Sequence, residues 1–477
     1  MSRAWTVPGI GHLDPPELDG QSYWMVDALA AEEPHPGGGA LTSTLRADVC
    51  IVGGGFTGLW TAIELKQRDP SLDVVLLEAG VCGSGASGAN AGILMNLWPK
   101  LPALMQAGGE TEALDVARAS VEVIDYVERF CKEHDIEAGL ERNGWLWAST
   151  NSSQDGAWNT TLAAALSHSG SPFIEVDMDT ATRIAGAPVR SGVLDPSCAG
   201  VHPGRLVRGL LRAARSLGVT VHEHSPMTGL DSEHGATVVR STHGSVRADS
   251  VVLAINAWCN QFPALRRHLL MTASDNVVVR PGSPSHTPPV TTNVSDSGRL
   301  LDYWRPLEHD KVLFGKAGLG LGWGVRGAST QFRTAPRRAS LMNHMTRSVP
   351  ALAGAEVIST WRAPVEYSLS SLPFFGELPD HPGVYFGTGY SGDGVGPSVL
   401  GARILASLST GADDGLASSF LTRPPAGRGL PPEPFRFLGG QLVKAAMLRQ
   451  ERKQDEEKRV DVMTNVLTRI DPTSFAG

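Results

Sequence analysis

The sequence lacks most features of a secreted, metal-binding or membrane protein. Its five cysteines are scattered, and no two form a CxxC pair, so we expect neither a disulfide framework nor a metal site. The apolar stretch at 93–105 is interrupted by Pro99, Lys100 and Pro102 and is too short to cross a bilayer. The N-terminus has no charged-then-apolar signal pattern. These absences predict a cytoplasmic protein without a membrane segment.

An excess of positive charge is also missing. Lys and Arg number 41 against 49 Asp and Glu, which gives a net charge of −8. This balance does not favour nucleic acid or an anionic membrane surface as a partner, although net charge says nothing about one local site. What the chain does have is length and ordinary composition: its 477 residues are 42% hydrophobic and 19% charged. Such a chain is expected to form two or three globular domains.

A glycine-rich turn separates a predicted strand from a predicted helix near the N-terminus. Residues 47–53 have the apolar run of a buried strand, 56–68 have helical spacing, and 73–78 predict a second strand. The turn at 53–58, GGGFTG, matches the pattern GxGxxG. This order of elements predicts a βαβ unit with a parallel sheet.

Each glycine of this turn has a physical role in binding a dinucleotide. Gly53 permits a tight turn, Gly55 lets the backbone approach a pyrophosphate, and Gly58 lets the helix lie close to the strand. The free N–H groups at the start of the helix would face the phosphates. Glu78 ends the second strand, where a carboxylate accepts the ribose hydroxyls. An ordinary glycine-rich turn is the alternative, and the position of Glu78 argues against it.

The same turn serves NAD and FAD, and three later segments favour FAD. Residues 82–88, CGSGASG, follow the second strand and are flexible enough to surround a flavin. The strand 251–254 and the following Asn256-Ala257-Trp258 suit the return strand that closes such a domain. Residues 389–396, GYSGDGVG, precede a predicted helix. The N-terminus of that helix could face the flavin pyrimidine, where negative charge gathers on reduction.

Periodicity predicts the remaining elements. Residues 1–46 are expected to form an irregular arm, and 426–477 a charged tail with a fraying surface helix. The other predictions are helices at 110–134, 203–217 and about 336–347, a strand pair at 139–149, strands and a hairpin at 219–254, and strand, turn and helix at 384–410.

Together these segments resemble the FAD-dependent amine- and amino-acid-oxidising flavoproteins related to D-amino-acid oxidase, glycine oxidase and sarcosine oxidase. The closer likeness is to the branch with the gamma-glutamylputrescine oxidases and, within it, to the aminophosphonate oxidoreductases. The stretches that carry the resemblance are SYW at 22–24, ADVCIVGGGFTGLWTAIELK at 47–66, LLEAGVCGSGASGANAG at 76–92, ADSVVLAINAW at 248–258, LPFFGELP at 372–379, GYSGDGVGPS at 389–398 and PPEPFRF at 431–437.

The resemblance implies an α/β flavoprotein of two domains in an α+β arrangement. A Rossmann-like FAD-binding domain is accompanied by a substrate domain with a mixed, largely antiparallel sheet over the flavin. The implied FAD-binding segments are 47–95, 196–260 and 358–425, and the substrate segments are 96–195 and 261–357.

The resemblance also implies contacts to FAD. They fall on Gly53, Gly55, Phe56, Thr57, Glu78, Ala86, Ser87, Gly88, Asn90, Ala91, Gly92, Met227, Gly392, Asp393, Gly394 and Val395. Ala89 stands where relatives have an arginine, so a cation near the cofactor is missing or supplied elsewhere. The late segment 364–376 contains no cysteine, unlike relatives that attach flavin there, so we expect non-covalent FAD.

Flavin-dependent amine oxidation needs a neutral amine whose Cα–H faces the flavin N5. Hydride leaves to the flavin, and water hydrolyses the resulting imine. Geometry and exclusion of water do most of this work, so the site should have aromatic walls, an anion anchor and few acids.

The segment Tyr303-Trp304-Arg305 fits that description on a predicted strand. Arg305 could bind a carboxylate or phosphonate through two hydrogen bonds. Lys316 and Arg326 could add charge; the alternative is that Arg305 and Lys316 are solvated strand residues. Because neighbouring strand residues face opposite sides, only one of the two aromatic residues should meet the substrate, and Trp304 suits the core better.

Other polar residues have competing interpretations. Glu366 and Tyr367 could bind an amine, or could support the site from behind. His202 is expected to be structural. The glycines between 315 and 324 predict a flexible loop over the site.

We therefore expect an FAD-dependent oxidase or dehydrogenase for a small aminophosphonate or amino acid, with O2 or another electron acceptor. Oxidation of a polyamine or gamma-glutamylated amine is the first alternative. A flavin-binding subunit without its own activity is the second, and an NAD-dependent dehydrogenase is a distant third.

Overall fold

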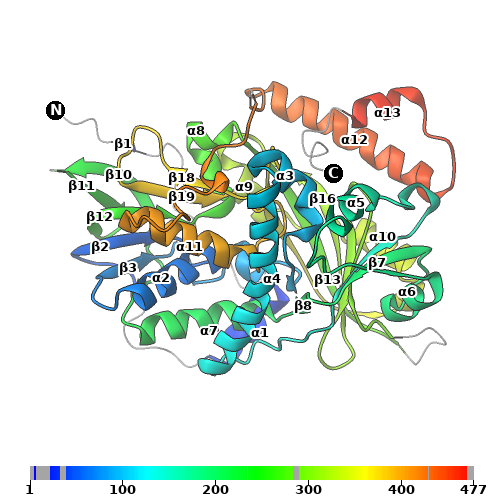
Figure 1. The fold of residues 1–477 in the computed structure, drawn as a ribbon, viewed down its shortest axis with the longest axis horizontal. Coiled ribbons are helices and arrows are strands. Elements are labelled where there is room, and N and C mark those ends of the chain that lie inside the picture. The colour runs from blue at the N-terminus through cyan, green and yellow to red at the C-terminus, as the bar shows by residue number, and fades with distance from the viewer. Residues whose placement is uncertain are drawn as a thin grey trace.

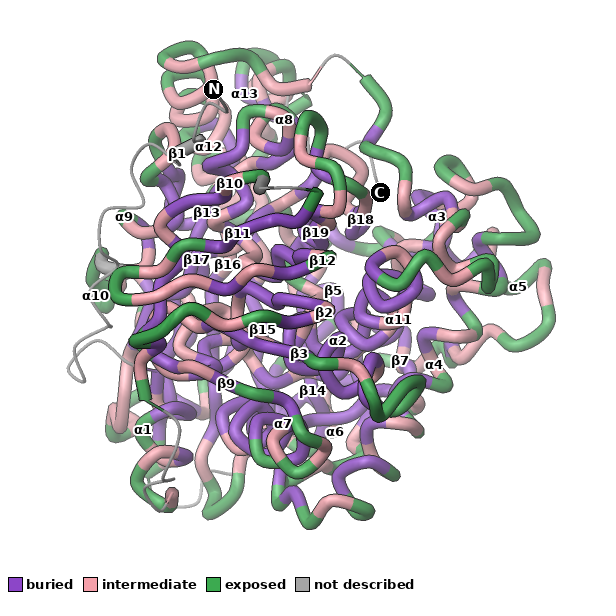
Figure 2. Tube along the Cα trace, turned by 90° about the vertical axis from the view of Figure 1, so that its left-hand side faces the viewer, coloured by how far each residue is buried: buried purple, intermediate pink, exposed green. Residues whose placement is uncertain are grey.

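A computed structural model describes residues 5–6, 22–32, 39–233, 235–282, 289–427 and 429–469. Two large sheets organise these residues, and they lie toward opposite ends of the molecule (Figure 1). The strands of both sheets are mostly buried (Figure 2). The described helices are α1 Tyr23–Ala30, α2 Phe56–Arg68, α3 Leu101–Gly108, α4 Glu110–Glu133, α5 Asn159–Leu166, α6 Met178–Ala185, α7 Pro203–Ser216, α8 Pro263–Arg266, α9 Gly327–Arg333, α10 Arg338–Ser348, α11 Pro397–Thr410, α12 Phe435–Asp455 and α13 Val462–Thr468.

The first sheet contains the predicted βαβ unit, formed by β2, α2 and β3. Within the described residues it has nine strands in the order β1-β10-β11-β12-β2-β3-β9, and β19 with β18 branches from β12. Its strands are β1 Trp5–Thr6, β2 Thr44–Val52, β3 Val74–Leu77, β9 Thr220–His222, β10 Met227–Glu233, β11 Ala236–Ser241, β12 Ser245–Leu253, β18 Phe374–Glu377 and β19 Val384–Thr388. Strands β19, β12, β2, β3 and β9 run parallel, as the motif predicts.

The central strand β2 is buried on both faces. Val49 and Ile51 pack into the cluster that contains α2 and α11, whereas Cys50 and Val52 pack into a second cluster on the other side. This alternation follows from the two-residue period of a strand. A continuous apolar run is therefore required here rather than an alternating one.

The second sheet is mixed and largely antiparallel, as expected. Its described strands number eight, in the order β17-β13-β16-β15-β14-β5-β7-β6, and the pair β14–β5 is parallel. They are β5 Trp145–Ser149, β6 Ile174–Val176, β7 Ser191–Asp195, β13 Leu269–Arg280, β14 Asn293–Asp296, β15 Asp302–Pro306, β16 Val312–Leu321 and β17 Glu356–Ser368. A short pair, β4 Ile93–Leu94 and β8 Ala199–Gly200, is separate from both sheets.

The N-terminal segment is more regular than predicted. Much of the expected arm lies outside the described residues, but Tyr23–Ala30 forms helix α1. Ser22 caps this helix by accepting from the N–H of Met25, and the Trp24 indole donates to the carbonyl of Asn90 at 2.8 Å. The SYW stretch thus fixes the helix against the segment that follows β3.

Three further predictions differ from the structure. Of the strand pair expected at 139–149, only β5 forms, with an isolated bridge at Glu141. Gly315, Gly318 and Gly320 belong to strand β16 rather than to a loop, whereas Gly322 and Gly324 follow the strand. A Cβ on Gly315 would lie 2.1 Å from the ring of Tyr303. Strand β17 pairs with β13 in the second sheet, so the segment predicted to start the last FAD-binding part at 358 still belongs to the substrate sheet.

The C-terminal region is held more firmly than a fraying tail. Helix α12 follows β16 in the opposite direction: Glu433 accepts from the N–H of Gly324, Lys444 donates to the carbonyl of Leu319, and Glu451 contacts Lys316. Among the helices that the structure describes, none combines the length and apolar character needed to cross a bilayer.

Candidate active site

A cavity of about 1270 Å³ lies between the two sheets. One wall is formed by the turns at the carboxyl ends of β2 and β3, by residues 83–91 and by residues 390–395. The other wall is one face of the second sheet. Parallel strands bring their carboxyl ends to a common edge, which is where nucleotides bind in such folds.

The turn after β2 has no room for larger residues. Gly53 has φ +110°, and a Cβ there would lie 2.4 Å from the carbonyl oxygen of Ala254. A Cβ on Gly58 would lie 1.9 Å from the carbonyl oxygen of Gly53. Gly53 and Gly55 line the cavity, whereas Gly58 does not and instead allows α2 to pack close to β2.

Hydrogen bonds hold the polar groups of this corner in place. The Ser87 hydroxyl accepts from the N–H of Phe56 at 2.8 Å, in the first turn of α2. The Glu78 carboxylate accepts from the N–H of Gly54 at 2.7 Å and from that of Gly80 at 2.8 Å. Burial raises the pKa of Glu78, and these backbone donors oppose that rise.

All but two of the residues expected to contact the cofactor line this cavity. The lining members are Gly53, Gly55, Phe56, Thr57, Glu78, Ala86, Ser87, Asn90, Ala91, Met227, Gly392, Asp393, Gly394 and Val395. Gly88 instead packs against Met25, because a Cβ there would lie 2.4 Å from its sulfur. Gly92 also lies away from the cavity, and its carbonyl oxygen accepts from the N–H of Val201.

The wall on the second sheet contains indoles and neutral polar groups beside the charged residues Asp296, Arg299 and Arg362. Trp145 and Trp147 of β5 line it, with ring centroids 5.7 Å apart. The Tyr303 hydroxyl lies 2.5 Å from the Ser274 hydroxyl and donates to Asn276 at 2.8 Å. Burial raises the pKa of Tyr303, so the phenol is neutral. Trp304 faces the opposite core and donates to the carbonyl of Ala185, as its alternation with Tyr303 predicts.

Glu366 is a buried carboxyl at the junction of the two walls. It lines the cavity and is only 2% exposed. One oxygen accepts from the Asn256 amide at 2.7 Å and from the N–H of Gly389 at 3.3 Å. Burial raises the pKa of Glu366 to about 7. Such a group can exchange a proton with a ligand near neutral pH.

Arg305 does not have the predicted orientation. Its guanidinium donates to the carbonyl oxygens of Gly92 and Val201, the latter at 2.8 Å, and it lies outside the cavity. Burial lowers the pKa of Arg305 to about 10. The prediction that Arg305 binds an anionic substrate group was wrong, because its guanidinium N–H groups already donate to backbone carbonyls of other segments.

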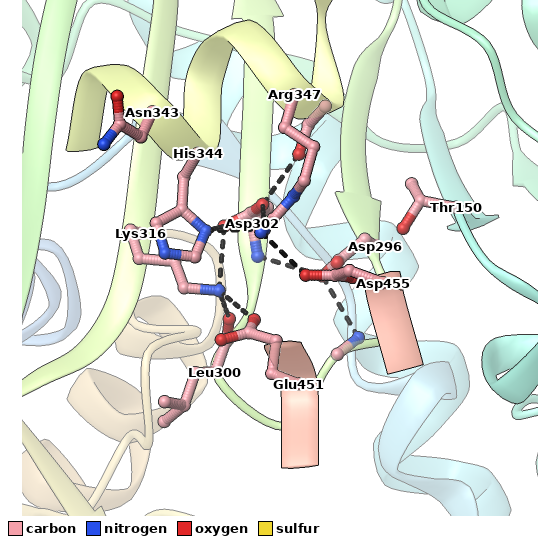
Figure 3. A network of polar contacts seen from close by, with 12 residues as sticks. Thr150, Asp296, Leu300, Asp302, Lys316, Asn343, His344, Arg347, Glu451 and Asp455 are labelled. Atoms are coloured by element: carbon pink, nitrogen blue, oxygen red, sulfur yellow. Dashed lines mark hydrogen bonds and ion pairs between the residues drawn. The ribbon is translucent and has the colours of Figure 1, made fainter. Parts of the chain in front are cut away.

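Lys316 and Arg326 are also absent from the cavity wall. The Lys316 ammonium is fully buried and contacts Glu451, Asp302 at 2.9 Å and the carbonyl of Leu300 (Figure 3). Asp302 and Glu451 lie together with His344 in a group that could hold a cation, and Lys316 is the cation that contacts both carboxylates. Arg326 is exposed in a turn. Neither fits the predicted role of adding charge to the substrate site.

His202 has a structural role, as expected. Its Nδ1 accepts from the N–H of Arg205 at the start of α7, and its Nε2 lies 3.1 Å from Asp27. Burial lowers the pKa of His202 to about 4. The ring is therefore neutral and caps the helix.

Three lining cations were missed by the sequence reasoning: Lys100, Arg299 and Arg362. Arg299 donates to the carbonyl of Thr468 at 3.0 Å. Arg362 of β17 pairs with Asp275 of β13 through two hydrogen bonds, one of 2.7 Å. Lys100 lies 2.8 Å from Asp393 and donates to the carbonyl of Ser371. The alternation along the strand 356–368 could have pointed to Arg362, whereas no local pattern links Lys100 to Asp393. The paired spacing of Trp145 and Trp147 was also a usable signal.

Comparisons with known proteins give a consistent result. The family model described as "DAO: FAD dependent oxidoreductase" matches residues 48–408. The gamma-glutamylputrescine oxidoreductase of Escherichia coli K12 is 28% identical over 378 residues, which cover 78% of this chain and 85% of the relative. The probable oxidoreductase OrdL of Haemophilus influenzae is 27% identical over 390 residues, covering 79% and 86%. The crystal structure of glycine oxidase from Geobacillus kaustophilus superposes with a TM-score of 0.65 at 23% identity, covering 80% of this chain and 100% of that one.

Proposed function

The chain belongs to the DAO family of FAD-dependent oxidoreductases, and on this premise we propose that it oxidises a small amine at the carbon bearing the nitrogen. The product is an imine that water hydrolyses, and O2 is the proposed electron acceptor. The observation that carries the proposal is the single cavity that joins the nucleotide corner of the first sheet to the aromatic face of the second.

The residues of the first wall fit FAD. Each oxygen of the Glu78 carboxylate accepts one backbone N–H and keeps acceptor capacity for a ribose hydroxyl. The Ser87 hydroxyl accepts from Phe56, so its own proton is available to a phosphate oxygen. Gly55 brings backbone to the cavity without a side chain. When bound, FAD supplies the acceptor for the two electrons of amine oxidation.

We propose that the cofactor is held without a covalent bond. Of the described residues that line the cavity, none is a cysteine or a histidine. All five cysteines are buried elsewhere, and burial raises the pKa of Cys82, Cys198 and Cys259. These thiols are consequently poor nucleophiles.

The second wall positions the amine. Glu366 can take a proton from a substrate ammonium, because its pKa lies near neutrality. Asn256 fixes the direction of this carboxyl by donating to it at 2.7 Å. The Tyr303 hydroxyl and its partners Ser274 and Asn276 give the same wall a fixed polar group, whose role is to orient the substrate.

An anionic substrate group would meet Arg362 rather than Arg305. The proposed substrate class is an aminophosphonate or amino acid, whose anionic group would be held by Arg362. The pairing of Arg362 with Asp275 neutralises much of its charge, and this observation favours the second candidate, a polyamine or gamma-glutamylated amine. The relative from Escherichia coli carries a name of that second class.

A substrate panel separates the two classes. Peroxide formation in air and dye reduction are measured with aminophosphonates, amino acids, diamines and gamma-glutamylated amines. An anionic class predicts that Arg362→Met raises KM more than about tenfold, whereas a cationic class predicts a much smaller change. Failure of every amine to react, with FAD present, would leave only a flavin-binding subunit.

A further inference from the structure

Large apolar side chains are concentrated on the outer surface of the two C-terminal helices. Six of them are between 52% and 78% exposed. We call this set the C-terminal apolar face; it comprises Phe435, Leu438, Leu442, Val462, Met463 and Val466. Helices α12 and α13 lie together at the outer edge of the molecule (Figure 1). Soluble proteins usually carry such residues singly, so a concentration of them indicates a contact surface.

The opposite side of α12 is already committed to the protein. Glu451 contacts Lys316, and Asp455 pairs with Arg347 at 2.7 Å (Figure 3). Lys444 donates to the carbonyl of Leu319. These contacts fix the rotation of the helix. The C-terminal apolar face therefore points away from the protein, because the opposite side of α12 makes the contacts to the second sheet.

The exposed charges within α12 are of one sign. Along α12 the exposed residues continue from Leu442 through Ala445 to Arg449 and Arg452. Burial lowers the pKa of Arg436, Glu433 opposes this shift, and Arg266 adds to it. No acidic residue of α12 is exposed. Its two acids are Glu451 and Asp455, which face the protein as described above.

The acids near α12 balance part of this charge: Glu456 and Glu457 are exposed just after the helix, where Glu456 pairs with Lys458 at 2.7 Å. Glu433 is engaged by the N–H groups of Gly324 and Phe437. Asp461 is shared between Arg449 at 3.2 Å and Lys453 at 2.8 Å. One carboxylate thus serves two cations. Apart from the inward-facing Glu451 and Asp455, the cations of the segment 449–461 outnumber its acids: Arg449, Arg452, Lys453, Lys458 and Arg459 against Glu456, Glu457 and Asp461.

We propose that the C-terminal apolar face docks the protein on a membrane surface that contains anionic phospholipids, with α12 parallel to the bilayer plane. A helix with Phe and Leu on one face and Arg and Lys beside them binds at the lipid interface, and each basic group gains from the negative headgroups. The net charge of −8 repels the other faces and so orients the molecule.

A second copy of the chain fits this surface less well. A two-fold contact would place the same patch against itself. Arg436, Arg449 and Arg452 of one copy would then lie near the same excess of cations on the other. Since none of the six residues lines the cavity, docking goes beyond the proposed catalytic function and is independent of it.

Sedimentation with vesicles tests the apolar part of the proposal. The full-length FAD-loaded protein should sediment with vesicles of mixed phosphatidylglycerol and phosphatidylcholine at low salt, and not with phosphatidylcholine alone. The variant Phe435→Ser/Leu438→Ser/Leu442→Ser should bind at least about tenfold more weakly. The matched control Leu166→Ser/Met178→Ser changes exposed side chains on α5 and α6 and should bind as the unaltered protein does.

A charge variant tests the electrostatic part. Arg449→Glu/Arg452→Glu should weaken binding more than about tenfold, whereas Arg129→Glu/Lys132→Glu on the exposed surface of α4 should not. Bound FAD and the melting temperature of each variant report that the fold is intact. The proposal is overturned if the wild-type protein does not sediment with anionic vesicles, or if it sediments equally with neutral ones. A dimer in size-exclusion chromatography that the triple serine variant dissociates would assign the face to a second copy instead.

Discussion

At the scale of single residues, the sequence predicted which kinds of side chain the site contains but not how each side chain is oriented. Tyr303 and Arg305 share one side of a strand by alternation, yet only Tyr303 lines the cavity. Arg305 is held by the carbonyl oxygens of Gly92 and Val201, which come from segments far away in the sequence. No local pattern contains those acceptors, and for the same reason the pairing of Arg362 with Asp275 was missed.

Glu366 is expected to control the pH dependence of catalysis. Because its pKa is raised to about 7 by burial, it is protonated below neutrality and cannot accept the proton of a substrate ammonium. The rate of anaerobic flavin reduction should rise with pH through about 7. Glu366→Gln should remove this limb and slow reduction by about a hundredfold, because the amide cannot take up a proton.

The control for Glu366 lies on the same strand. Glu356 of β17 is exposed and pairs with Arg280, so Glu356→Gln should leave the profile unchanged. An unaltered pH profile in Glu366→Gln, measured by stopped-flow absorbance, would show that another group sets the limb.

Glu78 is expected to hold the ribose of FAD. Glu78→Gln keeps the size of the side chain but removes the charge and one of the two acceptor oxygens, so FAD should bind about ten to a hundred times more weakly. Glu78→Lys should weaken binding further, since a cation replaces the acceptor. Asp73→Asn, on the exposed opposite end of the same strand region, is the control. Equal FAD affinity by equilibrium dialysis in all three variants would mean that the ribose lies elsewhere.

At the scale of elements, local periodicity predicted most of the nucleotide-binding unit. Helix α2 occupies 56–68 as expected, because its strand, turn and helix signals are all local. The glycines of β16 misled the prediction, since they suit a loop in isolation. A glycine is needed at position 315 because it leaves room for the ring of Tyr303 on the neighbouring strand β15.

Gly58 sets the distance between α2 and β2. An alanine there would place its Cβ 1.9 Å from the carbonyl oxygen of Gly53, so the helix must move. We expect Gly58→Ala to lower the free energy of unfolding by about 1–3 kcal/mol and to reduce bound FAD. Gly39→Ala, where a Cβ meets nothing within 4 Å, should do neither. Chemical denaturation and flavin absorbance measure both effects.

The contact between α12 and the second sheet depends on a buried ion pair. Lys316→Met leaves Asp302 and Glu451 without their shared cation, so unfolding should cost about 3 kcal/mol less. KM for the amine should not change, because Lys316 lies outside the cavity. A large rise in KM with unchanged stability would restore the original prediction that Lys316 contacts the substrate.

At the scale of the whole molecule, the site is a property of no single segment. The cavity takes one wall from residues 52–91 and 390–395 and the other from strands between 145 and 367. The fold class was predicted because the βαβ unit has a local pattern and the family resemblance implied the second, mixed sheet. The domain boundary near 358 was not predicted correctly, because only the pairing of β17 with β13 assigns that strand to the second sheet. The net charge of the whole chain likewise did not reveal that the exposed charges of α12 are positive.

The most direct test of the account is the visible spectrum of the purified protein during an anaerobic titration with amines. We predict a flavin absorbance band, release of FAD on denaturation, and bleaching of the band by at least one amine of the panel. A colourless protein that cannot be reconstituted with FAD would contradict the account at its foundation.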